Sequence, residues 1–150
     1  MKDITPPASA FTPRKKKEKL MSANAEIATK IAADLHPTEE GPNGETSLRD
    51  LVITALEGGI NYWGYVENYR PNDPDVWATV TEEESSTDAP AESAVLTIAS
   101  VRAGLAKAIE NRLDAGWSVT KCSEFFLTNP DAGSCELVIQ YVVLGEHVYA

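Results

Sequence analysis

Apolar residues recur every three to four positions in four segments of the chain, and this period predicts amphipathic helices. The segments are residues 22–35, 47–66, 97–115 and 118–129. Each begins with a serine or threonine that can cap a helix. The second begins Ser-Leu-Arg-Asp, which resembles a capping box with Asp in place of Glu. We therefore expect a helix-rich chain.

The period changes to two in residues 72–84, where Val76, Ala78 and Val80 occupy alternate positions. This alternation predicts a half-buried strand. A shorter partner strand is expected around residues 94–96. The acidic, Ser-rich stretch 82–93 between them is too polar to pack, which predicts a mobile loop. Together these segments predict a short antiparallel hairpin.

The end of the chain, residues 131–150, fits two structures. Its β-branched residues favour a strand, whereas its length after a capping Asp131 or Ser134 favours a helix. The pattern alone leaves residues 134–149 open between helix and strand.

Gly58 and Gly59 stand in the middle of the second predicted helix, on the stripe that also carries Tyr62 and Trp63. A glycine inside a helix costs about 1 kcal/mol relative to alanine, so a tertiary feature must offset the cost. Either another backbone approaches so closely that no Cβ fits, or the helix kinks and opens a cleft beside Trp63. Close packing is the simpler explanation.

Charge is distributed unevenly along the chain. The net charge is −10, but residues 1–19 hold six basic and two acidic side chains, so residues 20–150 carry −14. An acidic body repels phosphates, which argues against specific nucleic-acid binding by the folded part. The basic, Pro-containing residues 1–21 predict a disordered tail, with non-specific contact to nucleic acid or an acidic partner as the alternative.

Composition narrows the protein class further. A chain of 150 residues with 43% apolar residues suits one domain, and no apolar run reaches the roughly 18 residues of a membrane helix. We expect Cys122 and Cys135 to be reduced, buried thiols, and His36 and His147 lie too far apart for a zinc motif. Without a phosphate loop, nucleophile elbow or Cys/His arrangement, we expect neither an enzyme nor a bound metal or cofactor.

Two motifs, E-G-G-x-x-Y-W and Q-Y-x-x-x-G-E-x-x-Y, together resemble a set of small proteins encoded by bacteriophages and prophages. The matching residues are Glu57, Gly58, Gly59, Tyr62, Trp63, Gln140, Tyr141, Gly145, Glu146 and Tyr149. The helix start at Thr97, followed by Gly104-Leu105, is also similar. The resemblance covers about residues 47–150. It departs at Ala150, where glycine is usual, and at Cys135-Glu136, where an Ala-Asp pair is common.

The resemblance implies a phage origin and a compact α+β fold, and it favours helix for the C-terminal segment. No established activity comes with it. We therefore expect residues 22–150 to form a single α+β domain, helix-rich, with about five helices around a short antiparallel β-hairpin. The Gly58-Gly59 face is expected to pack against another helix, most simply the last one.

Both motifs place a glutamate close to glycine and aromatic residues. If their two helices pack through the glycines, the ten matching residues and Asn61 form a polar site with stacking walls. Such a site suits a base, a nicotinamide or an arginine side chain of a partner. The alternative is that each glutamate pairs locally and the aromatic rings belong to the core.

We expect a non-enzymatic phage accessory protein that binds a host or phage protein in the cytoplasm of the infected bacterium. Its carboxylates suit an acidic inhibitor of a host defence or nucleic-acid-handling protein. The acidic surface would consist of Glu82, Glu83, Glu84, Asp88 and Glu92. The alternative is a protein that binds or sequesters a nucleotide-like small molecule around Glu57, Trp63, Gln140 and Glu146. A homo-oligomer is compatible with both functions, and no membrane partner is expected.

Overall fold

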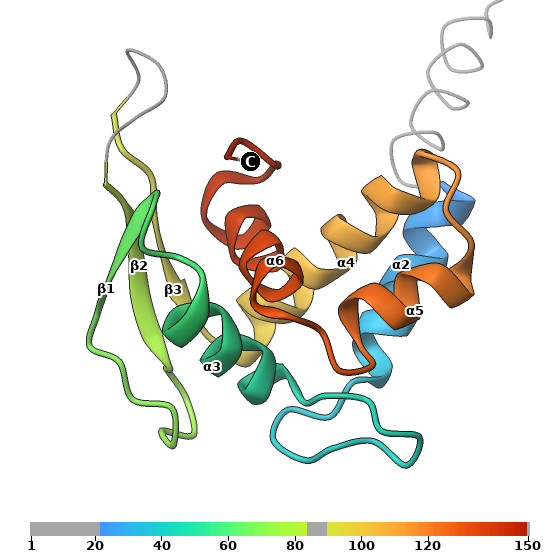
Figure 1. Ribbon diagram of the computed structural model, residues 1–150, viewed down its shortest axis with the longest axis horizontal. Helices are drawn as coiled ribbons and strands as arrows, with labels where there is room; N and C mark the ends of the chain where they lie inside the picture. Colours follow the sequence, from blue (N-terminus) through green and yellow to red (C-terminus); the bar gives the residue numbers. More distant parts are fainter. Residues whose placement is uncertain (1–21, 84–89, 150) are drawn as a thin grey trace, which may run out of the picture.

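The structure, a computed structural model, describes residues 22–83 and 90–149. Within these residues it contains five helices and one three-stranded antiparallel sheet (Figure 1). The helices are α2 (Ala23–Asp34), α3 (Leu48–Gly58), α4 (Ile98–Asp114), α5 (Val119–Phe126) and α6 (Ala132–Leu144). The strands are β1 (Gly64–Glu67), β2 (Ala78–Glu82) and β3 (Ser93–Leu96). The predicted helix-rich α+β class is confirmed. The predicted tail, residues 1–21, and residues 84–89 of the acidic loop lie outside the described residues.

The helices begin where their capping side chains predict. Ser22, Ser47, Thr97 and Ser118 each accept a hydrogen bond from the backbone N–H three residues further on. Asp131 does the same at the start of α6, so the helix alternative for the C-terminal segment is correct for residues 132–144.

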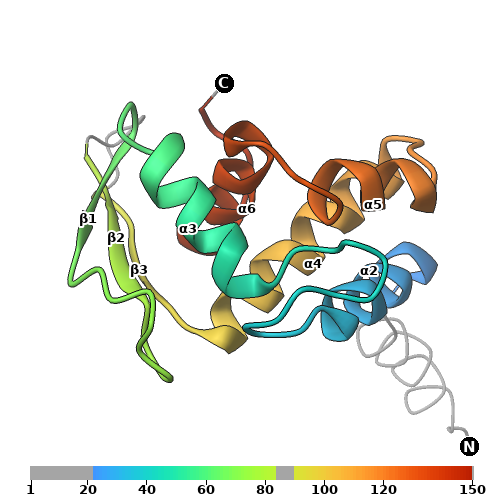
Figure 2. The same cartoon turned by 60° about the horizontal axis from the view of Figure 1, so that its bottom comes forward.

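Helices α4 and α6 form the centre of the molecule. Helix α6 packs against both α3 and α4, and α2 packs against α4 on the side away from α6. The sheet lies at one end of the molecule, and α2 and α5 lie at the other (Figures 1 and 2). Because α6 is covered on nearly all sides, its sequence is apolar all round, which explains its ambiguous period. No helix among the described residues is long and apolar enough to cross a membrane.

The sheet has the order β1-β2-β3, with both pairs antiparallel. On β2 the side chains of Ala78, Val80 and Glu82 are buried, while the two threonines between them are partly exposed. The predicted alternation is therefore confirmed from Ala78 onward. Val76 lies before the strand and is exposed, and β1 was not predicted at all.

Helix α3 ends at Gly58, so the prediction of a helix continuing to Val66 is wrong beyond that residue. The chain makes a turn after Gly59 and then enters β1, whose Val66 pairs with Val80 of β2. A Cβ on Gly58 would lie 3.0 Å from the Cβ of Ala132, and one on Gly59 would lie 3.1 Å from the Ala132 carbonyl oxygen. Close approach of α6 is thus the reason for the two glycines, and the predicted packing against the last helix is confirmed.

Candidate functional site

A buried carboxylate, Glu136 in the second turn of α6, is the centre of a hydrogen-bond cluster. Its Oε1 accepts hydrogen bonds from Tyr62 Oη at 2.8 Å, Trp63 Nε1 at 2.6 Å and Gln140 Nε2 at 2.6 Å. The side chain is only 5% exposed. Hydrogen bonds to an ionised acceptor are stronger than neutral ones, and three of them offset part of the cost of burying the charge. We call this group the Glu136 cluster.

The pKa of Tyr62 is shifted in this cluster. Burial raises the pKa of Tyr62 to about 12, and the hydrogen bond to Glu136 and the charge of that carboxylate act in the same direction. A phenolate beside Glu136 would place two negative charges together. Tyr62 therefore remains a donor to Glu136 across the physiological pH range.

Gln140, one helical turn after Glu136, fastens the C-terminal segment to α6. Its Oε1 accepts hydrogen bonds from the backbone N–H groups of Val148 and Tyr149, both at 2.9 Å. Its Nε2 donates to the carbonyl oxygen of Tyr149 at 2.9 Å, in addition to the bond with Glu136. Gly145 makes the return possible, because it ends α6 in the left-handed conformation with φ 79°.

Tyr149 covers the Glu136 cluster from the outside. Its ring stacks on Trp63 with centroids 5.7 Å apart and an interplanar angle of 10°. Its hydroxyl donates to Glu82 Oε2 at 2.5 Å. The C-terminal segment, the turn after α3 and strand β2 are therefore joined through one tyrosine.

A cavity of about 430 Å³ borders the cluster where α3, α4, α5 and α6 meet. Its wall consists of Gly58, Gly59, Tyr62, Arg112, Phe125, Ala132, Gly133, Glu136, Leu137, His147 and Tyr149. All three hydrogen bonds that the described residues make to Glu136 use Oε1. The other carboxylate oxygen, Oε2, accepts no hydrogen bond among the described residues. We call this space the Glu136 cavity.

Several predicted site residues meet at this cavity. Gly58, Gly59, Tyr62 and Tyr149 form part of its wall. Trp63 and Gln140 lie behind the wall and hold Glu136 through hydrogen bonds. The two separated motifs are thus brought together, as the packing of their helices requires.

The two glutamates of the motifs are not in this site, contrary to the prediction that their carboxylates converge. Glu57 is exposed and accepts a hydrogen bond from Tyr69 Oη at 2.6 Å, on the side of α3 that faces the β1–β2 connection. Glu146 is exposed after the end of α6. Asn61 is exposed in the turn after α3. Tyr141 is buried and, with Gly145, lines a separate cavity of about 240 Å³.

The structure also differs from the predicted acidic surface, because Glu82 is buried. Glu82 is only 4% exposed, because it follows Ala78 and Val80 on the inward face of β2. It accepts hydrogen bonds from Tyr149 Oη and from the backbone N–H of Glu92. Assigning Glu82 to the surface is therefore wrong. Glu83 and Glu92 are exposed, and Glu84 and Asp88 lie outside the described residues.

Sequence reasoning missed Glu136 and Arg112 as site residues. Glu136 carried a usable signal, because Glu136 and Gln140 stand four residues apart in the otherwise apolar run CELVIQYVVL and so share one helix face. Arg112 carried no such signal, since it stands among other charged residues near the end of α4.

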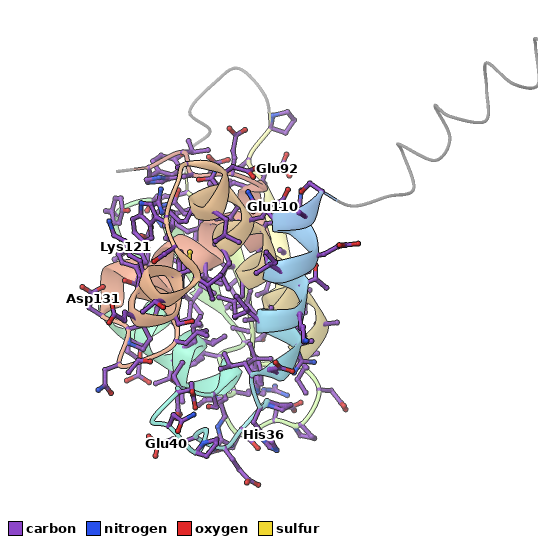
Figure 3. All side chains as sticks on the ribbon, turned by 90° about the vertical axis from the view of Figure 1, so that its right-hand side faces the viewer. His36, Glu40, Glu92, Glu110, Lys121 and Asp131 are labelled. Atoms are coloured by element: carbon purple, nitrogen blue, oxygen red, sulfur yellow. The ribbon has the colours of Figure 1, made fainter. Side chains whose placement is uncertain are left out.

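Within residues 22–83 and 90–149, the remaining reactive groups do not form a second site of the same kind. Cys122 and Cys135 are free and buried, and burial raises the pKa of Cys135 to about 12. Among the described residues no group of three or more His, Cys, Asp or Glu side chains could hold a metal ion. A cavity of about 540 Å³ lies beside His36 and Glu40, which are at the opposite end of the molecule from Glu92 (Figure 3). Its rim is acidic and it shares no residue with the Glu136 cavity.

The fold and the site together describe a helix-rich α+β protein with a buried carboxylate at the edge of a medium-sized cavity. Comparison with protein-family models, with curated proteins and with solved structures found no match for this chain. The resemblance to phage proteins and the phage origin therefore stay predictions.

Proposed function

We propose that this protein is a non-enzymatic binding protein that holds a nucleotide-like small molecule in the Glu136 cavity. The observation that carries the proposal is the carboxylate of Glu136, which lines the cavity, is held by three donors on one oxygen and accepts no hydrogen bond on the other among the described residues. The cavity volume of about 430 Å³ lies within the range of small-molecule sites.

The wall offers two kinds of contact that a nucleobase uses. Glu136 Oε2 accepts a hydrogen bond from an amino or imino N–H group, as carboxylates do with bases. Tyr62, Phe125 and Tyr149 present aromatic rings to a planar ligand. The described wall contains no serine or cysteine as a nucleophile, and its acid–base groups are Glu136 and His147.

The predicted role as an acidic phage accessory protein that binds a host or phage partner is the second candidate. It is supported by the charge of −14 on residues 20–150 and by the exposure of Glu83 and Glu92. Glu82 does not support this role, because its carboxylate accepts hydrogen bonds inside the fold. The Glu136 cavity is therefore the more specific feature, and we rank ligand binding first.

Native mass spectrometry of the purified protein, before and after denaturation, separates the two functions. Tyr62→Ala removes one wall of the cavity and one donor to Glu136. Tyr65→Ala is the matched control, because Tyr65 is similarly exposed, at 46% against 55%, and does not line the cavity. In parallel, the change in melting temperature is measured with the four ribonucleoside monophosphates.

We expect a retained small molecule, or a rise in melting temperature with a nucleotide, that Tyr62→Ala abolishes and Tyr65→Ala preserves. An empty wild-type protein that no nucleotide stabilises would exclude the ligand-binding function. If that protein co-purifies with another protein, and Glu83→Lys together with Glu92→Lys breaks the complex, the acidic partner function holds instead.

A further inference from the structure

Arg112, in the last turn of α4, lies in the wall of the Glu136 cavity. Its Nε is buried and has no hydrogen-bond partner among the described residues. No hydrogen bond or ion pair within those residues reaches the rest of its guanidinium, although the chain has 23 acidic residues against 13 basic ones. The N–H donors of its terminal nitrogens are therefore unused among the described residues.

The guanidinium is held in position by aromatic rings. Its central carbon lies 5.2 Å from the ring centroid of Trp117 and 6.0 Å from that of Phe125. Such cation–π contacts fix the plane of a guanidinium but leave its N–H donors unused. A partly buried cation with unused donors is costly in an apoprotein and favourable when an oxyanion is bound.

We infer that Arg112 binds an oxyanion of the ligand, either a phosphate or a carboxylate, in the Glu136 cavity. The inference rests on the proposed function of that cavity and specifies the class of ligand. Arg112 and Glu136 line the same space with opposite charges, so the fitting molecule carries an acidic group as well as an N–H donor.

The test compares pairs of probes that differ only in the oxyanion. The first pair is adenosine 5′-monophosphate and adenosine, and the second is 4-aminobenzoate and aniline. Calorimetry gives the affinities for the wild type and for Arg112→Gln. Lys121→Gln is the matched control, because Lys121 also lies over Trp117, at 4.3 Å, but does not line the cavity. Figure 3 shows Lys121 on the same side of the molecule as Asp131.

A second measurement uses the wild-type protein, so its result does not depend on whether Arg112→Gln folds. The Nε–H group of Arg112 is followed by NMR in the wild-type protein while each probe, and inorganic phosphate, is added. Binding of an oxyanion at the guanidinium shifts this signal directly.

We expect the anionic member of at least one pair to bind about ten- to a hundredfold more tightly than its neutral partner, as for a charge-assisted hydrogen bond. Arg112→Gln should remove this difference and Lys121→Gln should keep it. The pair that shows the difference tells phosphate from carboxylate.

Equal affinities within each pair, or an equal loss in both variants, would overturn the role of Arg112 and leave the cavity as a binding site. If no probe binds and the Nε–H signal does not move with inorganic phosphate, both the inference and the nucleotide-binding function are wrong.

Discussion

Removing the carboxylate of Glu136 tests whether the cluster stabilises the fold. In Glu136→Ala the three donors lose their shared acceptor. Tyr62 is 55% exposed and can turn to water, and Gln140 keeps its bond to the carbonyl of Tyr149. Trp63 is 1% exposed, so its indole N–H is left buried without an acceptor.

The expected magnitude follows from these differences. An unpaired buried donor costs about 1–3 kcal/mol, and this applies to the Trp63 N–H. The one methylene group that alanine lacks, Cγ, contributes about 0.8 kcal/mol when buried. Relief from burying a charge offsets part of the loss. We expect Glu136→Ala to lower the free energy of unfolding by about 1–3 kcal/mol, a substantial share of the ~5–15 kcal/mol typical of a domain.

Urea unfolding followed by circular dichroism measures this loss without relying on the emission of Trp63. Glu136→Gln keeps an acceptor oxygen and should lose only about 1 kcal/mol. Glu57→Ala removes an exposed carboxylate with a single tyrosine donor and should change stability by less than about 1 kcal/mol. A Glu136→Ala protein within about 0.5 kcal/mol of the wild type would refute the argument that the cluster is a structural centre.

Three further predictions concern packing and ionisation. Gly59→Leu should lower the free energy of unfolding by about 1–3 kcal/mol through overpacking against α6. Gly133→Ala, whose Cβ makes ordinary contact, should not lower it; equal urea midpoints would contradict the close-approach explanation. Cys135, with its pKa raised to about 12 by burial, should react slowly with a disulfide reagent at pH 8 in the folded protein and at once in urea; fast native labelling would contradict its burial. Because the pKa of Tyr62 is raised to about 12, its contribution to stability should be complete below pH 10 and lost as the pH rises through 12. Tyr62→Phe should therefore reduce the fall in unfolding free energy above pH 10, while Tyr69, Tyr141 and Cys135, whose pKa values are also raised, cause the rest; an unchanged pH profile would contradict the prediction.

Much of the helical structure was predictable from the sequence because its signals are local. Ser22, Ser47, Thr97 and Ser118 each cap a helix by binding a backbone N–H three residues away. The period of apolar residues then defines the buried face over the following turns. The alternation in β2 is local in the same sense, since successive side chains of a strand point to opposite faces.

The site was only half predictable. The motifs around Gly59 and Tyr149 correctly placed two parts of the cavity wall, because glycine in an apolar helical stripe indicates close approach. The sequence predicted that Glu57 and Glu146 supply the carboxylates of the site. In the structure, the carboxylate in the cavity wall belongs to Glu136. Which carboxylate points into a space between helices depends on how those helices are rotated against each other, and one helix alone does not contain that information.

By itself, then, the sequence determined the helix-rich α+β class, the starts of α2, α3, α4 and α5, and the glycine face that meets another helix. Only the tertiary structure decided that α3 stops at Gly58, that β1 adds a third strand, and that Glu82 turns inward. It also decided the Glu136 cluster, whose donors Tyr62 and Trp63 are 74 and 73 residues away along the chain. The physical reason is the range of the interactions: caps and periodicity act within a few residues, while strand pairing and burial of a carboxylate depend on which distant segments pack together.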